Sequence, residues 1–321
     1  MSNATPHRID VHHHIVPPRY LADVGVDRVF RQALPPLKKQ VMAWTPEKSI
    51  EEMDRNGIAT AFASVSAPGV WFDDVPFSRG IARMCNDYGA QLVRDHPGRF
   101  GLFASLPLPD IDGSLREIDN ALDTLAADGF VLMTSYGDRW PGDAAFAPLF
   151  DVLNRRKAVV FIHPTVPNCC VNLIAGVPDA AIEFMFDTVR AVVSLMMSGT
   201  LARYPDIRYI FCHAGSAVPL LASRITRAVA AHPNAASLAP AGPMHELRKL
   251  YYELAQSGSR EALTPLMQLV PVGQVMLGSD FPWTGWKLAD TICAVAKHGF
   301  SPDEIAAIER DNAVRLFPRL A

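Results

Sequence analysis

Short apolar segments alternate with amphipathic segments along nearly the whole chain of 321 residues. The apolar segments are rich in β-branched and aromatic residues and are followed by Pro or Gly, which is typical of buried strands that leave a sheet. Because strand and helix patterns take turns, the sequence predicts a parallel sheet. The eight predicted strands are residues 8–14, 58–64, 99–106, 129–134, 158–163, 207–213, 249–254 and 275–280.

Helix signals support the segments between these strands. Thr45 precedes Pro46 at a first-turn position, and Ser301 and Glu304 form a capping box with Pro302 inside the start of the closing helix. Three stretches show no regular pattern, and the first two follow strands that end in histidine, so we expect them to shape a pocket. The expected helices are 46–56, 77–95, 115–127, 146–156, 182–204, 219–231 and 302–316, and the irregular stretches are 17–44, 164–178 and 233–244.

The length of the chain suits a barrel of about 250 residues with insertions. Two ordinary domains would also fit within 321 residues. Since the alternation runs almost from end to end, we predict a single α/β domain over residues 1–321. Its expected fold is a TIM-like (β/α)8 barrel with inserted loops on the C-terminal face.

Histidine and aspartate stand at the ends of four of the predicted strands. His12 and His14 close the first strand, and they share one face because successive side chains of a strand alternate. His13 faces the other side and is expected to be packed or solvated. His163, His213 and Asp280 end three later strands. In a parallel barrel the carboxyl ends of the strands meet at the catalytic face, so the set predicts a metal site there.

The ligand types do not single out one metal. Neutral imidazoles and a carboxylate suit zinc, and also manganese or iron. We expect one divalent ion, with zinc as first choice and manganese as the alternative. Three or four protein ligands leave a position open for water or substrate, whereas a closed structural zinc usually draws on cysteines and on ligands close in sequence.

Composition excludes several classes of partner. The net charge is −3 and the charges of both signs are interspersed, so nucleic acid is not an expected partner. No run of about 18 apolar residues is present, so no membrane span is expected. The N-terminal residues lack the features of a signal peptide, which predicts a cytoplasmic protein. The five cysteines, among them the adjacent Cys169 and Cys170, fit reduced thiols in that compartment.

The strand-end motifs resemble the amidohydrolase superfamily, in the branch of aminocarboxymuconate semialdehyde decarboxylase and its phenolic-acid decarboxylase relatives. The resemblance rests on residues 9–14 (IDVHHH), 161–164 (FIHP), 213–215 (HAG) and 277–282 (LGSDFP), which together cover nearly the full length. The stretches 134–138, 186–188 and 198–201 are most similar to methylsalicylate decarboxylase-like sequences. After the third motif's histidine the family pattern has a run of glycines, and this chain has Ala-Gly-Ser-Ala.

The resemblance implies roles for the strand-end residues. His12, His14, His163 and Asp280 would bind one metal ion, since the fourth strand lacks the lysine that bridges two metals in binuclear relatives. His213 would act as an acid/base group beside the metal, with direct ligation left open. Either Asp280 or His213 would deliver a proton to the substrate.

The activity implied is metal-dependent, non-oxidative decarboxylation of an aromatic acid, of the hydroxybenzoate or 6-methylsalicylate kind, or of a muconate-like acid. The alternative is a metal-dependent hydrolase or hydratase that acts on a lactone, an amide or an unsaturated acid. A metal-binding module without turnover is a third reading. The expected partner is a small-molecule carboxylic acid, and relatives of this kind are commonly homodimers.

Aromatic residues on predicted loops and strand ends are candidates for stacking on a flat substrate, although each is more often ordinary packing. Arg224 lies beyond the sixth strand and is not expected to touch the substrate. The aromatic candidates are Trp44, Trp71, Tyr136, Trp140, Phe281 and Trp283.

Overall fold

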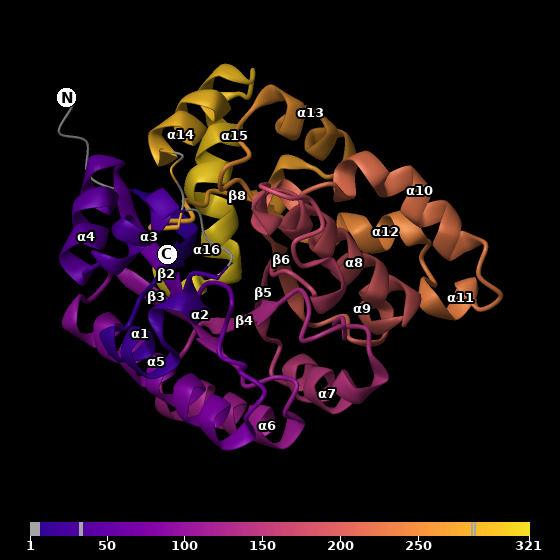
Figure 1. The fold of residues 1–321 in the computed structure, drawn as a ribbon. Helices are drawn as coiled ribbons and strands as arrows, with labels where there is room; N and C mark the ends of the chain where they lie inside the picture. The colour runs from indigo at the N-terminus through magenta and orange to yellow at the C-terminus, as the bar shows by residue number, and fades with distance from the viewer. Residues whose placement is uncertain (1–6, 32–34, 284, 286) are drawn as a thin grey trace.

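The computed structural model describes residues 7–31, 35–283, 285 and 287–321. Eight parallel strands form one sheet in which each strand pairs with the next in chain order, and Figure 1 shows the helices as a ring around them. The predicted TIM (β/α)8 barrel is therefore confirmed. The strands are β1 Arg8–His14, β2 Ile58–Ser64, β3 Phe100–Ser105, β4 Gly129–Met133, β5 Val159–His163, β6 Arg208–Phe211, β7 Tyr251–Glu253 and β8 Val275–Met276.

The barrel closes between β1 and the segment that follows β8. The Val11 N–H donates to the Leu277 carbonyl at 3.0 Å, and the His14 N–H donates to the Phe281 carbonyl at 2.8 Å. Only Val275 and Met276 of the expected strand 275–280 form regular strand pairing. The residues after them are hydrogen-bonded to β1, but their backbone is irregular. This closure brings the ends of the first and last strands side by side.

The helices agree with the prediction in most places. The Ser301 capping box is present, and the Thr45 side chain accepts a hydrogen bond from the Lys48 N–H. The expected helix 182–204 is broken at Gly199, whose positive φ of 71° ends one helix and starts another. The helices are α4 Pro46–Arg55, α5 Val75–Asp95, α6 Ile111–Asp119, α7 Ala147–Arg155, α8 Glu183–Met197, α9 Thr200–Arg203, α10 Val218–Ala230, α11 Ala235–Leu238, α12 Pro243–Arg248, α13 Arg260–Leu269, α14 Leu288–Lys297, α15 Pro302–Ala306 and α16 Asn312–Leu316.

The expectation that residues 17–44 are irregular is wrong for most of that stretch. It contains α1 Pro18–Val24, α2 Val26–Val29 and α3 Pro35–Met42, while residues 32–34 lie outside the described part of the chain. Proline at the first helical position pre-sets φ for a helix start, and α1 buries Tyr20 and Val24 against the barrel. Pro18 and Pro35 therefore open helices within a stretch that the sequence pattern predicts to be irregular.

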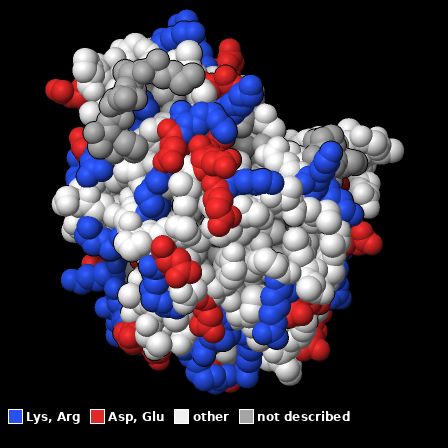
Figure 2. Space-filling model, turned by 90° about the vertical axis from the view of Figure 1, so that its left-hand side faces the viewer, with Lys and Arg blue, Asp and Glu red and all other residues white. Residues whose placement is uncertain are grey.

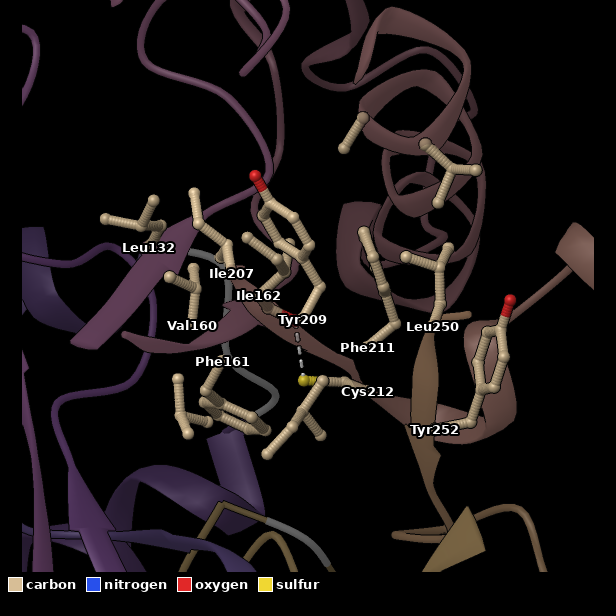
Figure 3. Close-up of a cluster of buried hydrophobic side chains, with 14 of the residues drawn as sticks. Leu132, Val160, Phe161, Ile162, Ile207, Tyr209, Phe211, Cys212, Leu250 and Tyr252 are labelled. Atoms are coloured by element: carbon tan, nitrogen blue, oxygen red, sulfur yellow. Dashed lines mark hydrogen bonds between the residues drawn. The ribbon is translucent and has the colours of Figure 1, made fainter. Parts of the chain in front are cut away.

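Side chains on the strands alternate between the barrel interior and the helical layer. Figure 3 shows this on β5 and at the end of β6, where Phe161 and Cys212 point inward and Ile162 and Phe211 point toward the helices. Inside the barrel, Phe103 stacks on Phe161 with ring centroids 5.4 Å apart. The ring of Phe161 in turn lies 5.0 Å from that of His12. The aromatic interior is thus the floor on which the site rests.

Charged side chains of both signs are interspersed on the face drawn in Figure 2. Within the described ranges, no helix combines the length and the apolar character needed to cross a membrane.

We expect Phe103→Ala to destabilise the protein by about 3 to 5 kcal/mol, because it leaves a cavity between the buried rings of Phe62 and Phe161. The measurement is the free energy of unfolding in denaturant. Leu220→Ala is the matched control, since Leu220 is 72% exposed, and it should change stability by no more than about 0.5 kcal/mol. Equal effects of the two substitutions would contradict the role of the interior rings.

Candidate metal centre and active site

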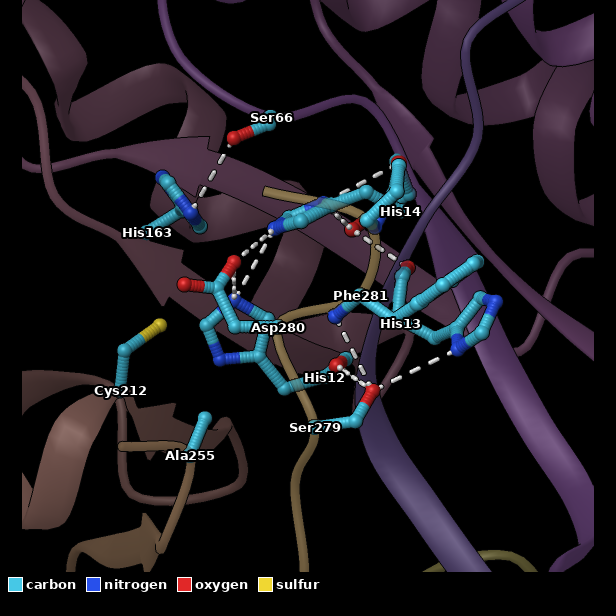
Figure 4. Close-up of polar contacts among 12 residues, drawn as sticks. His12, His13, His14, Ser66, His163, Cys212, Ala255, Ser279, Asp280 and Phe281 are labelled. Carbon is cyan, nitrogen blue, oxygen red and sulfur yellow. Dashed lines mark hydrogen bonds and ion pairs between the residues drawn. The ribbon is translucent and has the colours of Figure 1, made fainter. Parts of the chain in front are cut away.

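The C-terminal ends of two strands, β1 and β5, and the segment after β8 bring four of the predicted residues together (Figure 4). His12 and His14 leave β1 on one face, and their Nε2 atoms are 3.0 Å apart. Asp280 Oδ1 lies 3.2 Å from the first of these atoms and 3.1 Å from the second. With His163 from β5, the four candidate ligand atoms all lie within 4.8 Å of one another, and all four residues are buried.

Each of the three imidazoles is oriented by an acceptor behind it. A carbonyl or a carboxylate can only accept, so the ring nitrogen that faces it, Nδ1, carries the hydrogen. The other nitrogen, Nε2, then directs a lone pair toward the centre, as in histidines that bind metals. The three Nδ1–H groups donate from His12 to Glu253 Oε1 at 2.8 Å, from His14 to the Ser64 carbonyl at 3.2 Å and from His163 to the Pro164 carbonyl at 2.8 Å.

This donor set fits a divalent metal ion. Lone pairs on two Nε2 atoms 3.0 Å apart repel each other unless a cation lies between them. Asp280 Oδ1 is buried and accepts no hydrogen bond from the described residues. Three imidazole nitrogens and one carboxylate oxygen are the ligands that zinc and manganese accept, with room for further ligands from water or substrate.

Burial tunes the imidazoles for this role. It lowers the pKa of His14 to about 4 and that of His163 well below its usual value, so both rings are neutral near pH 7. Burial also acts to lower the pKa of His12, but the charges of Glu253 and Asp280 outweigh it and raise that pKa. The two buried carboxylates therefore favour positive charge at the centre.

His213 lies beside this cluster and outside it. It follows β6 with a positive φ of 55°, and its Nε2 is 3.5 Å from Asp280 Oδ2. Neither of its ring nitrogens has a hydrogen-bond partner among the described residues. His213 and Glu253 also lie close to His12, but His12 reaches Glu253 through its protonated nitrogen, so we assign no second ion there. The position suits the predicted acid/base role.

A cavity of about 330 Å³ opens above the centre. His163, His213 and Asp280 line its floor, and Phe184 and Trp283 are part of its walls. Most of the other lining residues are apolar, and no Lys or Arg is among the described residues that line it. The positive charge that pairs with the carboxylate of an acidic substrate would therefore come from the metal site.

The comparisons with known proteins agree with this geometry. The amidohydrolase family profile matches residues 9–319. The chain belongs to the amidohydrolase family. A decarboxylase of Aspergillus niger is 39% identical, over 97% of this chain and 88% of its own. A 6-methylsalicylic acid decarboxylase of Penicillium expansum is 33% identical, over 98% and 97%. The crystal structure of a 5-carboxyvanillate decarboxylase variant from Novosphingobium aromaticivorans shares the fold, with a TM-score of 0.85 at 21% identity over 97% of both chains.

Of the six aromatic candidates in this amidohydrolase, Trp283 alone lines the described cavity. The indole N–H groups of Trp44 and Trp140 donate to Ser49 and Asp187 instead. Phe184 lines the cavity and was not among the candidates, because it lies within a long helical pattern. Trp71, Tyr136, Phe281 and the exposed Arg224 lie outside the lining.

Glu253 is a residue of the site that the sequence did not single out. It ends β7 fully buried and accepts three hydrogen bonds: from His12 Nδ1 at 2.8 Å, from the His213 N–H at 2.7 Å and from the Ala255 N–H at 2.6 Å. It thus holds a candidate ligand and the candidate acid/base residue at once. Its signal in the sequence was a lone acidic residue inside the apolar run 249–254.

Asp10 is the second residue that was missed. Its carboxylate accepts hydrogen bonds from the His12 N–H at 3.0 Å, the Ser279 N–H at 3.0 Å and the Ser279 hydroxyl at 2.6 Å. It therefore fixes β1 against the residue that precedes Asp280. His13 is packed, as one of the two expectations had it, and its ring lies 3.1 Å from Asp10 Oδ2 and 2.9 Å from the Ser49 hydroxyl.

We expect Glu253→Gln to weaken metal binding by about 10- to 100-fold, because the partner that orients His12 loses its charge. The measurement is calorimetric titration of metal-free protein with zinc and with manganese. Glu309→Gln is the matched control, since Glu309 is a buried acid that pairs with Arg8 away from the site. Unchanged affinity in Glu253→Gln would contradict the orienting role.

Proposed function

We propose that the protein is a metal-dependent carboxy-lyase that removes carbon dioxide from an aromatic acid without oxidation. The observation that carries this proposal is a centre of three imidazoles and Asp280 on the floor of a largely apolar cavity. Relatives matched over nearly the whole chain are decarboxylases, which supports the reaction class predicted from the sequence. Nothing in the comparisons favours the alternative of a hydrolase or hydratase.

The substrate we propose is a hydroxybenzoate with one carboxylate and an apolar substituent, such as 6-methylsalicylate. One relative is named for that acid. The cavity supports the choice, because its apolar walls suit a ring and a methyl group, and no cation of the described lining would pair with a second carboxylate.

The proposed centre binds the ion through His12, His14, His163 and Asp280, and the ion supplies a Lewis-acid site for the carboxylate and a neighbouring hydroxyl group. The ring carbon must gain a proton before carbon dioxide leaves, because the electrons of the breaking bond then restore the aromatic ring. Asp280 and His213 both line the cavity, and Oδ2 of the first lies 3.5 Å from Nε2 of the second. We assign the proton to Asp280 for a phenolic acid and to His213 for a muconate-like acid.

Asp280 must take up a proton before it can deliver one. Burial acts to raise the pKa of its carboxyl, but the nearby imidazoles of His12, His14 and His213 outweigh burial and hold that pKa well below its usual value. In the proposed reaction the substrate's own hydroxyl supplies this proton. The proton then passes from Oδ2 to the ring carbon, and the phenolate product is reprotonated by water.

We expect carbon dioxide release from 6-methylsalicylate by the metal-loaded protein and a loss of at least about 100-fold in Asp280→Asn, because the proton donor is removed. The assay follows carbon dioxide and the phenolic product. Asp206→Asn, which changes an exposed aspartate, should leave the rate unchanged. If the protein releases no carbon dioxide from any of a panel of hydroxybenzoates and opens lactones instead, the function is hydrolysis.

We propose zinc as the resident ion and manganese as the alternative, which the solved 5-carboxyvanillate decarboxylase carries. Chelation should lower the melting temperature, because an ion that binds only the folded state stabilises it by about 2.7 kcal/mol at 100 times its Kd. Adding each ion back, with kcat measured, identifies the better one. His163→Ala should show a much smaller thermal response to added metal, and an equal response would place the ion elsewhere.

A homodimer and a cytoplasmic location complete the proposal. Leu173, Ile174, Val177 and Phe186 are exposed apolar residues between β5 and the first turns of α8, and exposed apolar side chains of this size suit a protein contact. Light scattering should give twice the mass of one chain. The cysteines are free thiols, as a reducing compartment would keep them.

A further inference from the structure

Gln256 occupies a tight turn after β7 in a conformation that its residue type does not favour. The Ser257 N–H donates to the Leu254 carbonyl at 3.0 Å, so Gln256 is the third residue of the turn, and its φ is +55°. Turns with positive φ at this position favour Gly or Asn. Strain of this kind persists in proteins mainly where the side chain has a function.

The side chain of Gln256 reaches the candidate catalytic carboxylate. Its Nε2 donates a hydrogen bond to Asp280 Oδ2, and the residue lines the cavity above the centre. The other oxygen, Oδ1, faces His12 and His14 at 3.2 and 3.1 Å. The two oxygens of Asp280 are thus divided between the metal site and the cavity.

We propose that Gln256 is a positioning residue that holds Asp280 Oδ2 toward the cavity for proton transfer to the substrate carbon. This inference rests on the proposed decarboxylation. The terminal torsion of an aspartate is broad and two-fold, so without this donor the position of Oδ2 would be restrained mainly through the contacts of Oδ1 on the other side of the carboxylate. His213 lies 3.5 Å from the same oxygen, a distance that restrains it weakly.

The chemistry of an amide suits this position. Gln256 donates a hydrogen bond without bringing a charge, whereas Lys or Arg would pair with the carboxylate and weaken it as a ligand and as a base. A hydrophobic residue of the same size would fill the space and leave Oδ2 without its donor. The proposed role therefore belongs to the amide group of Gln256, and the size of the side chain alone does not supply it.

Two substitutions test the proposal. Gln256→Met keeps the size of the side chain and removes the amide, and Gln256→Gly also relieves the backbone strain. Lys157→Gly is the matched control, because Lys157 is exposed, has a φ of +48° and follows α7 away from the cavity. Each variant is measured for kcat and KM with 6-methylsalicylate, for the solvent deuterium isotope effect on kcat, for zinc affinity and for melting temperature.

We expect kcat to fall by about 10- to 100-fold in both Gln256 variants, the loss typical of a residue that orients a ligand. KM and the Kd for zinc should change by less than about threefold, since Oδ1 keeps its place. The isotope effect should rise because the proton step becomes slower. Gln256→Gly should melt at or above the temperature of the parent protein, as should Lys157→Gly, which keeps the parent kcat.

Other outcomes overturn the proposal in distinct ways. Unchanged kcat in Gln256→Met means that the amide does not act in the reaction. A parallel loss of zinc affinity means that Gln256 supports the metal and not the proton transfer. No carbon dioxide from the parent protein rejects the proposed function first, and the role of Gln256 falls with it.

Discussion

The hydrogen bonds between β1 and the segment after β8 are the contacts on which the site depends most. The Asp280 N–H donates to the His12 carbonyl at 2.7 Å, so a residue near the end of the chain lies against the first strand. Asp10 strengthens this seam from the side by accepting bonds from His12 and Ser279. Three of the four candidate ligands therefore come from one closed seam, and only His163 must be placed by the sheet register from β2 to β5.

Buried carboxylates next to the closure between β1 and the segment after β8 explain why a cation would be stabilised there. The carboxylate of Asp10 accepts hydrogen bonds from a backbone N–H and a hydroxyl group. The carboxylate of Glu253 accepts them from His12 and from two backbone N–H groups. Asp280 Oδ1, by contrast, faces two imidazole lone pairs and accepts no hydrogen bond. A buried ionised group without compensation costs several kcal/mol, so this single oxygen marks where the ion is needed.

The strand ends were predictable because their signal is local. Apolar runs that stop at His12, His163 or Asp280 can be recognised in the sequence, and the parallel barrel brings such ends together. Glu253 and Gln256 were not predictable, since their importance arises from the turn after β7 and from what the barrel places opposite it. The helices of residues 17–44 were missed for a different reason: they are short and stabilised by packing on the barrel, so their sequence pattern is weak.

The catalytic face carries most of the backbone strain in the described chain. Nine non-glycine residues of the described chain have positive φ, and five of them follow β6, β7 or β8 at this face: His213, Ala214, Ser216, Gln256 and Asp280. Ala214 and Ser216 stand where the family pattern has glycines, which the positive φ explains. Each such residue costs on the order of 1 to 3 kcal/mol. A residue with positive φ ends a strand abruptly and turns its side chain over the mouth of the barrel. The fold is therefore less stable at the positions where the side chains of the site converge.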